Sequence, residues 1–273
     1  MKKRLFAFVF LNMMLLPLGL SACAPAASNG ETTAAVTDKP ENSVAADGTS
    51  AAATTTAEPK KSEPEISLEG KTIVWLGSSV TYGHANRGES MAEYLERSAH
   101  CISAKYAVSG TTLVDNGDNS YISRMKKIPT DQKCDYFICQ LSTNDATQKK
   151  PLGKISDSFD IDSFDTSTVC GAIEYVIAYA KERFGCPVAF YTNPPYDSAE
   201  YRRMVSSMLK IKEKWGIEVL DLWNNEDLAA MSREERDAFL KRNMADSIHP
   251  NALGYRRWLT PIFEEFIKKT IVK

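Results

Sequence analysis

The chain has 273 residues, with 33 basic and 35 acidic side chains, and its formal net charge at pH 7 is −2 when the histidines are neutral. No basic stripe stands out along the sequence, so the charge pattern argues against nucleic acid as a partner. Residues 67–273 are enough for one well-buried domain and short for two.

Residues 1–22 have the three parts of a secretory signal: a basic start at residues 2–4, an apolar stretch and a small-residue end. The end of this segment, Leu-Ser-Ala followed by Cys23, resembles the lipobox of bacterial lipoproteins. The resemblance implies cleavage before Cys23 and lipidation of this cysteine, which predicts an exported protein anchored to the outer face of the cell membrane. The alternatives are an ordinary signal peptide and an uncleaved anchor helix.

The next segment, residues 23–66, consists of Cys23 and a stretch rich in Ala, Thr, Ser, Glu and Pro. It has almost no large apolar side chains, so it cannot bury enough surface to offset the entropy lost on ordering. We therefore expect a disordered tether between the anchor and the domain at residues 67–273.

The domain alternates between apolar runs and helical patterns. The apolar runs predict strands at residues 71–77, 105–110, 134–142, 186–193 and 217–223. Apolar spacing and capping residues predict helices at 89–102, 120–127, 165–184, 198–215, 233–241 and 252–269. Nearly continuous apolar strands separated by helices indicate an α/β fold with a parallel sheet covered on both faces. Ligands bind such sheets beyond the carboxyl ends of the strands.

Polar residues suited to acyl transfer follow several of these strands. Ser79 comes directly after the first strand, Gly110 ends the second, and Asn144 follows the third. A serine nucleophile needs a base, an acid that orients the base, and donors for an oxyanion. Asp246 precedes His249 by three residues, a spacing at which a turn can bring the carboxylate against the ring. Taken singly, each of these residues can also be explained as an ordinary turn residue.

Taken together and in this order, four stretches resemble the sequence blocks of the SGNH, or GDSL, hydrolase superfamily. The first block, Gly-Asp-Ser-x-Thr-x-Gly, is matched by residues 77–83, with Ser79 at the position of the nucleophile. The second block supplies a glycine, matched by Gly110. The third, Gly-x-Asn-Asp, is matched by residues 142–145, and the last, Asp-x-x-His-Pro, by residues 246–250.

The resemblance implies the flavodoxin-like fold of that superfamily, a three-layer α/β/α sandwich with a five-stranded parallel sheet. It implies a serine esterase without metal or organic cofactor, in which Ser79 attacks, His249 takes its proton and Asp246 orients the ring. The oxyanion is then held by the backbone N–H groups of Ser79 and Gly110 and by the side chain of Asn144. The expected substrate is an O-acyl ester, in particular an acetyl ester, of carbohydrate at the cell surface.

Alternatives remain within and outside the enzyme class. Ser78 replaces the aspartate of the first block and Ser142 the glycine of the third. The change at Ser78 leaves open a degenerate member that binds glycans without turnover. A lysophospholipase or small lipid esterase is the alternative substrate class, and a two-lobed solute-binding lipoprotein is the alternative fold.

Other residues of the domain carry weaker expectations. The loop at residues 143–165 is long enough to be a lid or a binding segment. Cys134 and Cys139 are expected to face opposite sides of one strand, and buried, mostly free thiols are the default for the domain. Four aromatic residues are candidates either for stacking on a sugar or for half-buried packing: Tyr82, Tyr121, Tyr196 and Trp223.

Overall fold

The computed structural model describes residues 66–272. The predicted signal segment, Cys23 and the tether up to residue 65 lie outside the described residues, so they stay predictions.

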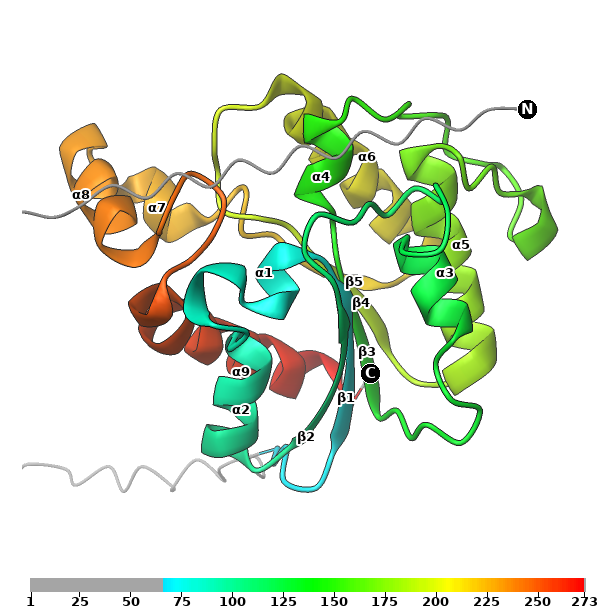
Figure 1. The fold of residues 1–273 in the computed structure, drawn as a ribbon, viewed down its shortest axis with the longest axis horizontal. Helices are drawn as coiled ribbons and strands as arrows, with labels where there is room; N and C mark the ends of the chain where they lie inside the picture. Colours follow the sequence, from blue (N-terminus) through cyan, green and yellow to red (C-terminus); the bar gives the residue numbers. More distant parts are fainter. Residues whose placement is uncertain (1–65, 273) are drawn as a thin grey trace, which may run out of the picture. The chain divides into compact units, whose positions relative to one another are not determined.

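Five strands form one sheet in the order β2-β1-β3-β4-β5, and all neighbouring strands are parallel (Figure 1). The strands are β1 (Thr72–Gly77), β2 (Ile102–Ala107), β3 (Tyr136–Gln140), β4 (Val188–Tyr191) and β5 (Glu218–Leu220). The predicted α/β class and five-stranded parallel sheet are confirmed. The part of the chain that the structure describes contains this one sheet. It therefore differs from the two-lobed body expected of a solute-binding protein.

The second strand lies at residues 102–107, whereas the sequence predicted residues 105–110. β2 is an edge strand, and its first residue, Ile102, is 52% exposed. An edge strand of this kind lacks the continuous run of buried apolar residues from which the inner strands were predicted. Its start is therefore set by pairing with β1, where Thr72 lies opposite Ile102.

Six helices occupy the predicted places. They are α2 (Met91–Ala99), α3 (Tyr121–Lys126), α5 (Val169–Phe184), α6 (Ala199–Trp215), α8 (Arg233–Asn243) and α9 (Thr260–Thr270), the last preceded by a π-helical turn at Gly254–Leu259. Three further helices were not predicted: α1 (Ser79–Tyr82), α4 (Thr143–Thr147) and α7 (Glu226–Ala230). Each is about one turn long, too short to show a helical repeat in the sequence.

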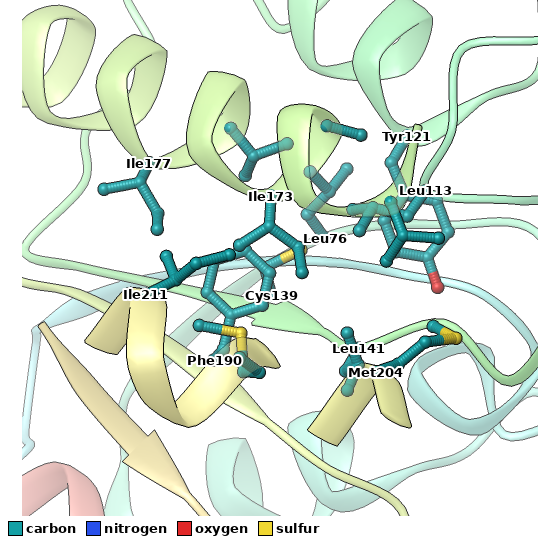
Figure 2. Close-up of a cluster of buried hydrophobic side chains, with 14 of the residues drawn as sticks. Leu76, Leu113, Tyr121, Cys139, Leu141, Ile173, Ile177, Phe190, Met204 and Ile211 are labelled. Carbon is teal, nitrogen blue, oxygen red and sulfur yellow. The ribbon is translucent and has the colours of Figure 1, made fainter. Parts of the chain in front are cut away.

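The two faces of the sheet carry separate hydrophobic clusters because successive strand residues point to opposite sides. In β1, Val74 and Leu76 join the cluster under α3, α5 and α6, whereas Ile73 and Trp75 join the cluster under α2 and α9. Figure 1 shows these two groups of helices on opposite sides of the sheet. In Figure 2, strand residues such as Leu76 face Ile173 of α5. The described domain is thus the expected three-layer sandwich.

The long loop after β3 is fastened to the helical layer by a buried ion pair. Glu174 of α5, whose side chain is fully buried, pairs with Lys214 of α6. The Lys214 ammonium donates to the carbonyl of Ser156 at 2.7 Å, and the N–H of Ser156 donates to Glu174 Oε2 at 2.8 Å. The middle of the loop is therefore held against α5 and α6.

Candidate active site

Ser79 is the first residue of α1, directly after the tight turn that follows β1. Gly77 makes this turn possible, because a Cβ at this position would lie 1.8 Å from Thr81 Oγ1. Gln140, the last residue of β3, holds the turn: its Oε1 accepts from the N–H groups of Ser78 at 3.0 Å and Thr81 at 3.2 Å, and from the Thr81 hydroxyl at 2.9 Å. Ser79 itself is 5% exposed. Gln140 was not singled out from the sequence, although a polar residue inside an apolar strand is a signal that could have found it.

The structure brings Ser79, His249 and Asp246 into one hydrogen-bonded chain, although Ser79 and His249 are 170 residues apart. His249 Nε2 lies 2.8 Å from Ser79 Oγ, and His249 Nδ1 lies 2.8 Å from Asp246 Oδ2. A carboxylate at Nδ1 favours the tautomer that keeps the proton there, which leaves Nε2 free to accept the serine proton. This is the arrangement that a serine nucleophile and its base require.

Asp246 also organises the turn on which His249 stands. Its Oδ1 accepts from the backbone N–H groups of Ile248 at 2.8 Å and of His249 at 2.7 Å. Partial burial raises the pKa of Asp246, but hydrogen bonds from the His249 ring and from these two N–H groups outweigh burial and leave the pKa below its usual value. Asp246 therefore stays ionised at neutral pH and can stabilise a protonated His249.

A second residue, Asn193, ties the same turn to the sheet. It follows β4 and is fully buried, and its Nδ2 donates to the carbonyl of Ile248 at 3.1 Å. Its own backbone N–H donates to the hydroxyl of Tyr201 in α6 at 2.8 Å. The sequence placed residues 193–196 as a candidate wall of the pocket but did not predict this contact, because only the folded chain brings Asn193 against the turn of His249.

Gly110 and Asn144 lie on adjoining segments. Gly110 has a φ of +80°, which favours glycine, and a Cβ placed there would meet nothing within 4 Å. Asn144 stands in α4, and its Nδ2 donates to the carbonyl of Thr111 at 2.9 Å, beside Gly110 in the chain. That bond uses one of the two amide protons, so the second proton of Asn144 is left for another acceptor.

A buried carboxylate and a partly buried guanidinium hold the Gly110 segment in place. Asp145 accepts from the N–H groups of Leu113 at 2.7 Å and Val114 at 3.0 Å. Burial raises the pKa of Asp145, and hydrogen bonds to its carboxylate oppose that shift. Arg124 donates to the carbonyl of Gly77 at 2.6 Å and to Thr111 Oγ1 at 2.9 Å, which links the end of β1 to this segment.

The aromatic candidates are arranged differently from one another. Tyr121 is fully buried, so the idea that it stacks on a sugar was wrong. Trp223 is 9% exposed and packs against Tyr196, with ring centroids 5.5 Å apart. Tyr82 is 41% exposed. The packing alternative therefore describes Tyr121 and Trp223, whereas Tyr82 is open to solvent and the partly buried Tyr196 also lines a cavity.

A cavity of about 450 Å³ lies beside Asp246. Its walls come from the loop after β4 and from the end of α8, and they include Pro195, Tyr196, Asp197, Leu240, Lys241 and Met244. Its volume falls within the range of about 300–1,000 Å³ that is common for small-molecule sites. The side chains of its walls offer both apolar contact and hydrogen bonds.

Within residues 66–272, no group of three or more His, Cys, Asp or Glu side chains is placed to hold a metal ion. No helix of that same part of the chain combines the length and the apolar character needed to cross a bilayer.

Several solved structures share this fold, and two of the three described here are named as a lipase candidate and an esterase. A protein from Lactobacillus plantarum superposes with a TM-score of 0.61 at 20% identity, covering 74% of this chain and 98% of that one. A GDSL-like lipase candidate from Bacteroides ovatus gives 0.52 at 16% identity, over 74% and 100% of the two chains. An acetyl xylan esterase gives 0.50 at 14% identity, over 72% and 99%. These low identities support the fold alone.

Similarity to known sequences is found at the level of a family profile. No curated protein matches the chain. Residues 75–257, which span the turn of Ser79 and the turn of His249, match the sequence profile of the GDSL-like lipase/acylhydrolase family. Since this match covers most of the described domain and runs through the residues that the fold gathers at one edge of the sheet, the chain belongs to the GDSL-like lipase/acylhydrolase family of ester hydrolases.

Proposed function

We propose that the protein is a serine esterase that removes O-acyl groups, acetyl groups in particular, from carbohydrate at the cell surface. The observation that carries the catalytic part is the hydrogen-bonded chain from Ser79 Oγ through the His249 ring to the Asp246 carboxylate. Family membership supports ester hydrolysis as the reaction class.

The proposed reaction proceeds in two acyl-transfer steps. His249 Nε2 takes the proton of Ser79 as Oγ attacks the ester carbonyl, and Asp246 stabilises the charge on the ring. The N–H groups of Ser79 and Gly110 and the free amide proton of Asn144 stabilise the oxyanion. His249 then protonates the leaving alcohol, and a water molecule activated by the same ring releases the acid.

The carbohydrate part of the proposal has two supports. One solved structure with this fold is named an acetyl xylan esterase, although at 14% sequence identity the similarity of the two chains supports only a shared fold. The cavity beside Asp246 offers Asp197 and Lys241 as hydrogen-bonding groups next to the ring of Tyr196, a mixture that suits a sugar. The predicted lipid at Cys23 would hold this site at the outer face of the cell membrane.

A lipid ester is the second candidate substrate. It is favoured by the apolar side chains of Pro195, Leu240 and Met244 on the walls of the same cavity, which suit an acyl chain. Rates on acetylated oligosaccharides and on lysophospholipids, measured on one preparation, separate the two candidates. A preference for lysophospholipids would contradict the carbohydrate assignment and leave the serine mechanism in place.

Two adjacent serines provide a matched test of the mechanism. The Ser79→Ala variant is expected to lose hydrolysis of p-nitrophenyl acetate and labelling by a fluorophosphonate, because Oγ is the attacking atom. The Ser78→Ala variant is expected to keep the label, because the Ser78 hydroxyl faces Gln140 at 3.4 Å. Labelling that survives in Ser79→Ala would overturn the assignment of the nucleophile. Wild-type protein without label or turnover on any of these esters would favour the glycan-binding alternative.

A further inference from the structure

Two cysteines at one end of the sheet lie in contact. Cys134 Sγ and Cys186 Sγ are 3.2 Å apart, and the two residues are separated by 52 positions in the chain. Each comes two residues before a strand, Cys134 before β3 and Cys186 before β4. These strands are parallel neighbours, with Phe137 opposite Val188, and the N–H of Phe137 donates to the carbonyl of Pro187 at 3.0 Å. The pairing of the strands thus places the two sulfurs side by side.

The contact differs from what the sequence indicated. Cys134 was expected on the opposite side of the strand from Cys139, yet Cys134 lies outside β3 and packs against the same hydrophobic cluster that contains Cys139. The other cysteines of the described domain are buried, with exposed fractions of 4% or less: Cys101, Cys139 and Cys170. Cys134 and Cys186 are only partly buried, so a soluble thiol reagent has better access to them.

We propose that Cys134 and Cys186 form a disulfide that staples the amino ends of β3 and β4. A disulfide bond is about 2.05 Å long, so each sulfur has to move by only about 0.6 Å, a shift that side-chain rotation supplies. The proposal depends on the sheet register alone and not on the proposed esterase function. Oxidation of this pair leaves Cys101, Cys139 and Cys170 as buried thiols.

The pair is arranged for thiol–disulfide exchange. The hydrogen bond from the Cys134 thiol lowers the pKa of Cys186, against the effect of burial, and raises the pKa of Cys134. The thiolate is the attacking form, so Cys186 attacks first.

With oxidised glutathione as the oxidant, Cys186 bonds to one glutathione sulfur and expels the other as a thiolate. Cys134 then loses its proton to solvent and attacks the Cys186 sulfur, which expels the second glutathione thiolate. The two cysteines lose two protons and two electrons in total, and one glutathione disulfide is reduced to two thiols.

The staple lies away from the catalytic residues. Ser79 follows the carboxyl end of β1, whereas the two cysteines precede the amino ends of β3 and β4, and all of these strands run parallel. Oxidation is therefore expected to raise the Tm and to leave esterase activity nearly unchanged. Closing a loop of this size corresponds to a Tm difference of roughly 5–15 °C between oxidised and reduced protein.

Peptide mapping of the full-length protein tests the bond directly. The protein is incubated with oxidised glutathione, its remaining thiols are alkylated, and it is digested with trypsin without reduction. Cleavage at Lys133, Lys149, Arg183 and Arg202 gives peptides 134–149 and 184–202. The expected product joins these peptides and weighs two hydrogens less than their sum. Because peptide 134–149 also contains Cys139, fragmentation between Cys134 and Cys139 assigns the link.

Matched variants complete the test. The Cys134→Ala and Cys186→Ala variants are expected to lose the linked peptide and the effect of reductant on Tm, whereas Cys139→Ala keeps the link. Recovery of both wild-type peptides in alkylated, unlinked form would overturn the proposal, as would a link through Cys139. A wild-type Tm that reductant does not change would show that the disulfide does not stabilise the fold.

Discussion

Gln140 and Thr81 are joined twice, since Gln140 Oε1 accepts from both the backbone N–H and the side-chain hydroxyl of Thr81. Gln140 ends β3 in the centre of the sheet, and Thr81 lies in the short helix that begins at Ser79. The candidate nucleophile is therefore positioned by the strand next to its own. Tyr191, at the end of β4, extends the connection, because its hydroxyl lies 2.6 Å from Thr81 Oγ1.

Replacing Gln140 by leucine keeps the side-chain size but removes this acceptor. Each buried donor left without an acceptor costs about 1–3 kcal/mol of the free energy of unfolding. We also expect kcat to fall by about 10–100-fold, since small displacements of a reacting group have effects of that order. Urea unfolding and ester kinetics measure both effects. The matched control is Gln148→Leu at an exposed position; equal behaviour of the two variants would show that Gln140 does not position Ser79.

Replacing Asn144 by alanine tests the proposed oxyanion donor. Loss of one such donor lowers kcat by about 10²–10³-fold, and KM changes little because the bond strengthens in the transition state. The control is Thr147→Ala in the same short helix, and circular dichroism checks that both variants fold. An Asn144→Ala variant with wild-type kcat would exclude its side chain from the oxyanion site.

Replacing Asp246 by asparagine affects both turnover and acid stability. The amide no longer holds the His249 proton at Nδ1, and kcat is expected to fall by about 10⁴-fold. Because the pKa of folded Asp246 lies below the ordinary value of 3.8, the ionised carboxylate stabilises the fold above that pH. This stabilisation is lost as the pH falls through the folded-state pKa.

Urea unfolding at neutral and acid pH measures the second effect of Asp246→Asn. The variant is expected to lose less stability on acidification than the wild-type protein. Asp197→Asn, a change at an exposed aspartate on the neighbouring loop, serves as the comparison. Identical acid sensitivity of wild type and Asp246→Asn would show that this carboxylate has no part in the pH dependence.

Breaking the ion pair of Glu174 and Lys214 is expected to loosen the loop after β3. Glu174→Ala leaves a largely buried ammonium without its carboxylate, which typically lowers the free energy of unfolding by about 3–5 kcal/mol. The double variant with leucine at Glu174 and methionine at Lys214 should recover much of that loss. Glu265→Ala, which breaks an exposed pair with Lys269, should change stability little. A Glu174→Ala variant as stable as wild type would contradict a fastening role.

Replacing Cys23 by alanine tests the predicted anchor. Without the acyl chains the protein is expected to appear in the soluble fraction, because those chains supply the membrane affinity. Incorporation of a labelled fatty acid into wild type, and its absence from Cys23→Ala, measures lipidation directly. Retention of the unlabelled variant in membranes would indicate an uncleaved apolar segment in place of a lipid.

Much of the fold could be predicted because it depends on short-range patterns. Inner strands and long helices carry apolar residues at fixed spacing, so β1 and α5 were placed within a few residues. The predicted range of β2 was wrong by three residues because an edge strand has no such continuous run. The one-turn helices were not predicted because they are too short to show a helical period. The candidate residues Ser79, Gly110, Asn144, Asp246 and His249 were found because each follows a predicted strand or belongs to a short motif.

Local sequence patterns were enough to predict the succession of the five strands and the longer helices, the family, and the polar residues that are candidates for chemistry. Only the folded chain shows that Gln140 supports the Ser79 turn, that Asn193 supports the His249 turn, and that Cys134 lies against Cys186. These contacts join residues far apart in the chain, and they follow from the register between strands and the packing of helices on the sheet. Local periodicity indicates which face of a helix or strand is buried, but it does not indicate which distant side chains contact that face.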